Sequence, residues 1–140
     1  MSERVVVLHV LEALEGGTAR HVVDLVSHVE GVRHVVAVPP RRVGAPTDPM
    51  AVARLHGAGA DVRHVRMTRH PVSLANAAAI AAVAGLARQV GADVVHAHSS
   101  IAGVVGRLAS VGTGARRFYT PHALAPGRLP LATERLLGRL

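Results

Sequence analysis

The chain has 140 residues, a net charge of +7 and an apolar content of about half, made up mainly of Val, Ala and Leu. This length suits one domain with a substantial core, and the absence of cysteine excludes disulfides and thiolate metal sites. The positive charge comes from arginine alone, because no lysine occurs. Phe118 and Tyr119 are the only residues of the Phe, Tyr and Trp class, so we expect no nucleic-acid surface built on stacking.

The first part of the chain predicts a strand, a helix and a second strand. Val5–Val10 is a short apolar run that suits a buried strand. Apolar residues then recur at helical spacing from Thr18, the expected N-cap, to a stop at Gly31. His34–Val38 reads as the next strand. The N-terminal apolar run is too short and too interrupted for a signal peptide or a membrane span, so we expect a cytoplasmic protein.

The alternation of helix and strand continues to residue 120. We expect three more helices, a short one within 49–57, one from the cap Ser73 to about Val90 and one from 101. We expect three more strands, at 61–65, 94–97 and 117–120. Five strands alternating with helices predict an α/β fold with an open, doubly wound parallel sheet. The loops "EALEGGTAR", "AHSSIAG" and "TPHALAPG" each follow a strand, so they fall on the edge where such sheets bind ligands.

The last residues, "TERLLGRL", begin an amphipathic helix with Leu136, Leu137 and Leu140 but carry no stop signal. We therefore expect residues 1–140 to form a single domain that is incomplete at its C-terminal end.

Gly16 and Gly17 stand between the first strand and the first helix. Free N–H groups at a helix N-terminus attract phosphate or carboxylate, and glycine lets a ligand approach the backbone closely. The alternative is a tight turn that binds nothing. The G-x-G-x-x-G fingerprint and the G-K-[ST] ending of a P-loop are both absent, so this is no ordinary NAD or ATP site.

His96 and His98 alternate along a strand and therefore share one face. Two such histidines can chelate a metal, but no carboxylate or cysteine stands nearby, so no metal is expected. Instead, one histidine is expected to pack beneath a helix and the other to line a cleft. Ser99 and Ser100 are natural N-caps for the helix that follows.

Three further features concern the later half of the chain. Gly103 and Gly106 lie opposite or beside the apolar stripe of their helix, where another backbone is expected to approach closely. His122 ends the last strand and either serves a ligand, as hydrogen-bond donor or as acid or base, or is satisfied by the backbone. The basic group within residues 63–70 is either a contact to anionic lipid or phosphate or a solvated face.

Three stretches together, "EGGTARHVVDLV", "DVVHAHSSIAGVVGRLAS" and "RRFYTPHALA", resemble the N-terminal domain of a family 4 glycosyltransferase. This family is the large retaining group with the GT-B fold, in which two Rossmann-like domains face each other across a cleft. The resemblance covers essentially the whole chain. It implies a glycosyltransferase that uses a nucleotide-sugar as substrate, with no cofactor and no metal.

The resemblance also implies roles for individual residues. Gly16, Gly17 and Thr18 match the family's glycine loop, which lies against the diphosphate or sugar of the donor. His122 matches the family's histidine that lines the donor sugar pocket, and the resemblance implies that it is the catalytic residue of this chain. A further set matches the cleft edge on the acceptor side, namely His98, Ser99 and Ser100.

The family's C-terminal domain, which holds most of the donor with its basic pair and E-x7-E glutamates, has no counterpart in the sequence. We therefore expect this chain alone to be inactive or nearly so, and to need a separate C-terminal domain. The implied setting is polysaccharide or glycolipid assembly with an unknown acceptor, beside an anionic membrane and without nucleic acid. The alternative is a non-catalytic sugar- or phosphate-binding or assembly module that pairs with a separate C-terminal chain.

Overall fold

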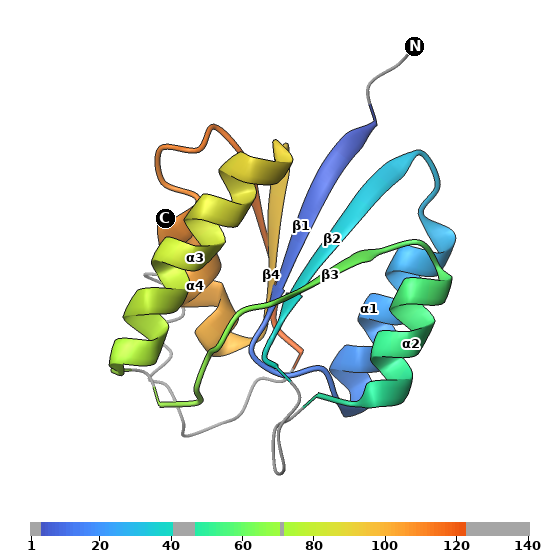
Figure 1. The fold of residues 1–140 in the computed structure, drawn as a ribbon, viewed down its shortest axis with the longest axis horizontal. Helices are drawn as coiled ribbons and strands as arrows, with labels where there is room; N and C mark the ends of the chain where they lie inside the picture. Colours follow the sequence, from blue (N-terminus) through green and yellow to red (C-terminus); the bar gives the residue numbers. More distant parts are fainter. Residues whose placement is uncertain (1–3, 41–46, 71, 123–140) are drawn as a thin grey trace.

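A computed structural model describes residues 4–40, 47–70 and 72–122, and these form one parallel sheet between two layers of helices (Figure 1). The strands are β1 (Val5–Leu11), β2 (Val32–Val38), β3 (Asp61–His64), β4 (Val94–His98) and β5 (Arg116–Thr120). Their order in the sheet is β3-β2-β1-β4-β5, and every neighbouring pair is parallel. The predicted open, doubly wound sheet is thereby confirmed.

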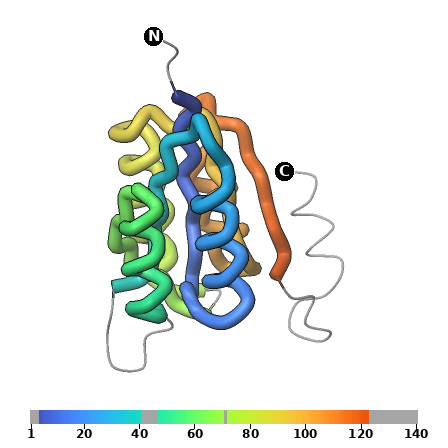
Figure 2. The backbone as a smooth tube through the Cα atoms, turned by 90° about the vertical axis from the view of Figure 1, so that its right-hand side faces the viewer, coloured from blue at the N-terminus to red at the C-terminus, as the bar shows by residue number. Residues whose placement is uncertain are grey.

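Two helices cover each face of this sheet. They are α1 (Gly16–His28) and α2 (Pro49–Gly57) on one face, and α3 (Leu74–Val90) and α4 (Ser100–Ala109) on the other. The view in Figure 2 shows β5 running along one edge of the molecule, with α2 toward the opposite side. Among the described residues, no helix is long and apolar enough to cross a membrane.

The ends of α3 follow from its sequence, whereas the start of α1 does not. Ser73 caps α3 by accepting a hydrogen bond from the Asn76 N–H at 3.1 Å, and Gly91 ends it in the left-handed conformation, both as predicted. By contrast, α1 begins at Gly16 after the N-cap Glu15, so the prediction of Thr18 as N-cap is wrong. Gly16 has a φ of 56°, which lets the chain turn into the helix before Thr18 is reached.

The apolar residues of the strands divide between two cores because side chains alternate along each strand. Leu8, Val10, Val35 and Val95 point toward α3 and α4 and belong to a continuous apolar core. On the other face, toward α1 and α2, the buried apolar strand residues are Leu11, Val36 and Val38. The same face of β1, β2 and β4 also carries four histidines, His9, His34, His96 and His98, which are described below.

Helix α4 packs closer to the sheet than its apolar stripe predicts. Ile101 and Val105 are buried as expected, but Leu108 is 49% exposed. The buried face includes both glycines of the helix: a Cβ at Gly106 would lie 2.9 Å from the Ala97 Cβ, and one at Gly103 would lie 2.7 Å from a ring carbon of Tyr119. The predicted close approach is therefore present: side-chain atoms make its nearest contacts, and the backbone Cα of Ala97 lies 3.9 Å from the Gly106 Cβ position.

Candidate functional site at the carboxyl edge of the sheet

The segments that follow β1, β4 and β5 meet at the carboxyl edge of the sheet. Leu11 of β1 pairs with His98 of β4, and His98 pairs with Thr120 of β5, so these three strands end side by side. His21, from the second turn of α1, has its ring centroid 5.9 Å from that of His98 and 5.0 Å from that of His122. The helix that begins with the two glycines, the end of β4 and His122 thus share one edge, as the sequence predicted.

The N-terminus of α1 is open to a ligand. Gly16 and Gly17 are exposed, and among the residues that the structure describes, a Cβ at either position would meet nothing within 4 Å. The N-cap residue Glu15 makes no side-chain hydrogen bond to the helix, and its carboxylate instead accepts one from Arg69 at 2.6 Å. Uncapped N–H groups at the positive end of a helix dipole, with open space before them, form the usual setting for a bound anion.

The N-terminus of α4 differs because it already holds a carboxylate. Glu12, which follows β1, accepts a hydrogen bond from the Ala102 N–H at 3.0 Å through Oε2. Ser99 occupies the predicted N-cap position with a φ of 72°, but its hydroxyl donates to the His98 carbonyl and makes no capping bond. Ser100 is the first residue of the helix. Sequence reasoning missed Glu12, whose only signal is an acidic residue directly after a strand.

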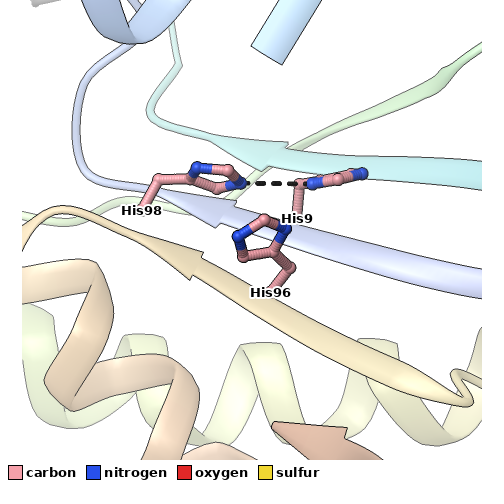
Figure 3. A group of neighbouring side chains, drawn as sticks. All are labelled: His9, His96 and His98. Carbon is pink, nitrogen blue, oxygen red and sulfur yellow. Dashed lines mark hydrogen bonds between the residues drawn. The ribbon is translucent and has the colours of Figure 1, made fainter. Parts of the chain in front are cut away.

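Beneath this edge lies a group of histidines that line one face of the sheet. His98 is completely buried, and its Nε2 lies 3.2 Å from Nδ1 of His9 (Figure 3). On its other side, the Nδ1 of His98 lies 3.0 Å from Nε2 of His122. Half-buried His96 contacts Thr120 instead, with 2.7 Å between Nε2 and Oγ1. His98, expected at the cleft surface, therefore supports the edge from below.

Burial keeps these imidazoles neutral. With the neighbouring histidines as a lesser cause, burial lowers the pKa of His9 to about 3, that of His98 to about 2 and that of His96 to about 4. The pKa of His122 is also lowered, first by burial and then by His21. At neutral pH the site therefore presents His122 as an uncharged imidazole.

Two triads of histidines within the described ranges bring their ring nitrogens within 4.8 Å of one another, close enough to hold a metal ion by ligand count. They are His9, His96 and His98, and His21, His98 and His122. In both triads, however, nitrogens of His98 already contact other imidazoles, and no carboxylate or thiolate completes either set. The hydrogen bonds of His9 and His98 thus account for their ring nitrogens without an ion, and the expectation of no metal stays a prediction.

The basic group at residues 63–70 is partly neutralised. Arg63 donates to both carboxylate oxygens of Asp61, at 2.8 and 2.9 Å, and this hydrogen bonding lowers the pKa of Asp61. Arg69 is paired with Glu15, which ties the segment after β3 to the start of α1. Two of the arginines thus serve neighbouring carboxylates, which weakens the field that this group would offer to an anionic surface.

Comparison with known proteins assigns the domain, though not this edge in particular, to a family. Residues 5–140 match the model of the glycosyl transferase 4-like domain. The chain belongs to this family. Its fold, predicted as a Rossmann-like half of a GT-B structure, is confirmed. No curated protein matches the sequence.

Three solved structures share the fold at 14% sequence identity. A glycosyltransferase from Rickettsia africae ESF-5 gives a TM-score of 0.73, with 97% of this chain and 34% of that chain covered. MurG from Acinetobacter baumannii gives 0.66, with 96% and 39% covered, and a UDP-N-acetylglucosamine 2-epimerase gives 0.61, with 97% and 38% covered. The glycosyl transferase 4-like chain thus spans little more than a third of these proteins.

Proposed function

We propose that this domain is one half of a retaining glycosyltransferase, which moves a sugar from a nucleotide-sugar donor to an acceptor without a metal or cofactor. The observation that carries the proposal is the open N-terminus of α1, together with the contact of His21, in the second turn of the same helix, with the rings of His98 and His122. An anion site and a neutral imidazole side by side suit a ligand that combines phosphate groups with sugar hydroxyls.

The proposed roles follow from this placement. The backbone of Gly16, Gly17 and Thr18 binds the phosphate or sugar of the donor, because the first turn of α1 begins with two exposed glycines and the half-buried Thr18. His122 contacts the donor sugar as an uncharged group. The acceptor side is formed by the end of β4 and the start of α4, where Ser99 and Ser100 lie above the buried His98.

Full activity requires a second domain. The departing nucleoside diphosphate develops charge, and fixed cations and dipoles aimed at it are a main source of rate. The described edge offers one helix N-terminus and neutral imidazoles. We therefore expect the chain alone to bind a donor weakly and to transfer sugar very slowly. The proposed setting is polysaccharide or glycolipid assembly at the cytoplasmic face of a membrane.

A single methyl group tests the donor site. Gly17→Ala adds a Cβ that meets no other described residue within 4 Å, so the fold should tolerate it, but the methyl group will occupy the space through which a ligand reaches the backbone. We expect UDP-glucose, UDP-N-acetylglucosamine or GDP-mannose to shift the amide resonances of residues 16–19 and the ring signals of His122. The Gly17→Ala variant should weaken that binding roughly tenfold, equivalent to about 1.4 kcal/mol.

Gly85→Ala is the matched control. Gly85 is an exposed glycine within α3, and its added Cβ also meets nothing within 4 Å. Both variants replace a helical glycine, so both should raise stability by up to about 1 kcal/mol, and only Gly17→Ala should weaken binding. Equal loss of affinity in both variants, or nucleotide-sugar shifts confined to residues far from the carboxyl edge, would refute the donor site.

A further inference from the structure

Four histidines from four segments form a continuous hydrogen-bonded chain across the sheet. The Nδ1 of His34 in β2 lies 3.0 Å from Nε2 of His9 in β1, and the Nδ1 of His9 lies 3.2 Å from Nε2 of His98 in β4. The last contact, 3.0 Å, joins Nδ1 of His98 to Nε2 of His122. We call His34, His9, His98 and His122 the histidine chain. Figure 3 shows its central link between His9 and His98.

The far end of the histidine chain has a fixed polarity. Nε2 of His34 lies 3.3 Å from the carbonyl oxygen of Val29, and a carbonyl oxygen only accepts hydrogen bonds. His34 must therefore carry its hydrogen on Nε2, which leaves a lone pair on Nδ1. That lone pair requires a donor, so His9 in turn carries its hydrogen on Nε2.

The same requirement passes along the rest of the chain. His9, with its hydrogen on Nε2, accepts through Nδ1 from Nε2–H of His98, and His98 accepts through Nδ1 from Nε2–H of His122. A second proton on His9 or His98 would sit on Nδ1 and point at the Nε2–H of the next histidine. This repulsion, in addition to burial, disfavours the cationic forms of His9 and His98. Within the described residues, no hydrogen bond is made to Nδ1 of His122, where the ordered sequence of donors and acceptors ends.

We propose that His34, His9 and His98 are positioning residues that hold His122 in a single neutral tautomer, with its hydrogen on Nε2 and a lone pair on Nδ1 for the ligand. The identity of that ligand as a donor sugar rests on the proposed function. His122 would then accept a hydrogen bond from a sugar hydroxyl rather than donate one. A surface histidine without such support would exchange between its two tautomers.

Nitrogen NMR of the whole chain, labelled with ¹⁵N in its histidines, tests this directly. Long-range correlations from the ring protons distinguish the protonated from the unprotonated nitrogen of each imidazole, and the His122→Gln variant identifies the signals of residue 122. At pH 7.5 we expect His9, His34, His98 and His122 each to show hydrogen on Nε2. A His122 that carries its hydrogen on Nδ1, or averages both forms in the folded protein, would overturn the proposal.

A remote substitution tests whether the histidine chain causes this order. His34→Phe keeps an aromatic ring of similar size but removes the bond to Val29 and the acceptor for His9. Without this fixed end, the hydrogen bonds that link His9, His98 and His122 can run in either direction at nearly equal free energy. His122 should then exchange between its two tautomers, and the chemical shifts of its two ring nitrogens should move toward a common average. His28→Phe is the control, because His28 is exposed, bonds only within α1 and should leave His122 unchanged.

The outcomes separate this inference from the proposed function. If His34→Phe leaves the tautomer of His122 intact in a folded protein, the histidine chain does not position it. If the variant does not fold, the spectrum of the wild-type chain still decides the tautomer. If the tautomers are as expected but no nucleotide-sugar perturbs residues 16–19 or His122, the proposed function fails while the positioning role stands.

Discussion

The two faces of the sheet use the same strands for different purposes. Toward α3 and α4, the strands present Leu8, Val10, Val35 and Val95, all buried in an apolar core. Toward α1 and α2, the positions that alternate with these carry His9, His34, His96 and His98. Neighbouring residues of β1, Leu8 and His9, thus place a side chain that cannot take up a proton on one face and a buried imidazole that can titrate on the other. One face supplies stability at every pH, and the other links stability to the protonation of histidine.

Acidification should produce the largest effect, through the histidine face. In the unfolded chain His9 and His98 take up a proton below pH 6.5, whereas in the folded chain they stay neutral down to about pH 3 and about pH 2. The unfolded state therefore binds more protons in this window, and stability falls as pH falls. Each of these two histidines should cost about 2 kcal/mol between pH 7 and pH 5, and together they should cost about 4 kcal/mol.

Urea unfolding at pH 7, 6 and 5 measures this dependence. His9→Leu removes one of these two histidines and should make the slope shallower, while His28→Leu, at an exposed position in α1, is the control variant. A free energy of unfolding that stays level from pH 7 to pH 5 would mean that the buried imidazoles are charged, or that the histidine face opens to water in the native state.

Leu8→Ala should produce the next largest effect, on the apolar face. Leu8 is fully buried beside His9 in β1, and removing its isopropyl group leaves a cavity between the sheet and the helices α3 and α4. We expect a loss of about 3 kcal/mol in the free energy of unfolding. Because no proton is involved, the curve of stability against pH should drop as a whole and keep its slope. A changed slope would show that the two faces are coupled through β1.

Much of the fold was predictable from the sequence because it depends on local pattern. These signals depend only on residues that are close in the sequence. They include the apolar runs at Val5–Val10 and Val94–Ala97, the N-cap at Ser73 and the helix stop at Gly91. The start of α1 was misplaced because a glycine with positive φ opened the helix two residues before the polar residue that looked like its cap. Backbone freedom at Gly16 outweighed side-chain capping at Thr18.

The histidine chain was not predictable in the same way, since it depends on the order of the strands. His9 and His34 were read only as members of apolar runs, and their contact requires β1 to lie between β2 and β4. One signal was present: three valine-rich runs each contain histidine, one at His9, one at His34, and two at alternate positions, His96 and His98, in the third. Polar side chains in buried strands must find partners, and across this parallel sheet His9, His34 and His98 find them in one another.

The smallest expected effect compares the two glycines where α4 meets the sheet. The nearer obstacle to a Cβ is at Gly103, 2.7 Å from a ring carbon of Tyr119, while Gly106 would bring its Cβ to 2.9 Å from the Ala97 Cβ. Distance alone predicts that Gly103→Ala lowers the free energy of unfolding more than Gly106→Ala does. We expect the reverse, because the obstacle at Gly103 is an outer ring carbon of Tyr119 on the edge strand β5, which can shift aside together with the Arg107 guanidinium over the ring, whereas the Ala97 Cβ is attached directly to the backbone of β4. Gly106→Ala should cost about 1–2 kcal/mol and Gly103→Ala less than about 1 kcal/mol, each partly offset by the helix preference of alanine. Thermal unfolding of both variants decides between the two rankings, and a larger loss at Gly103 would show that the tyrosine, not the strand, sets the position of α4.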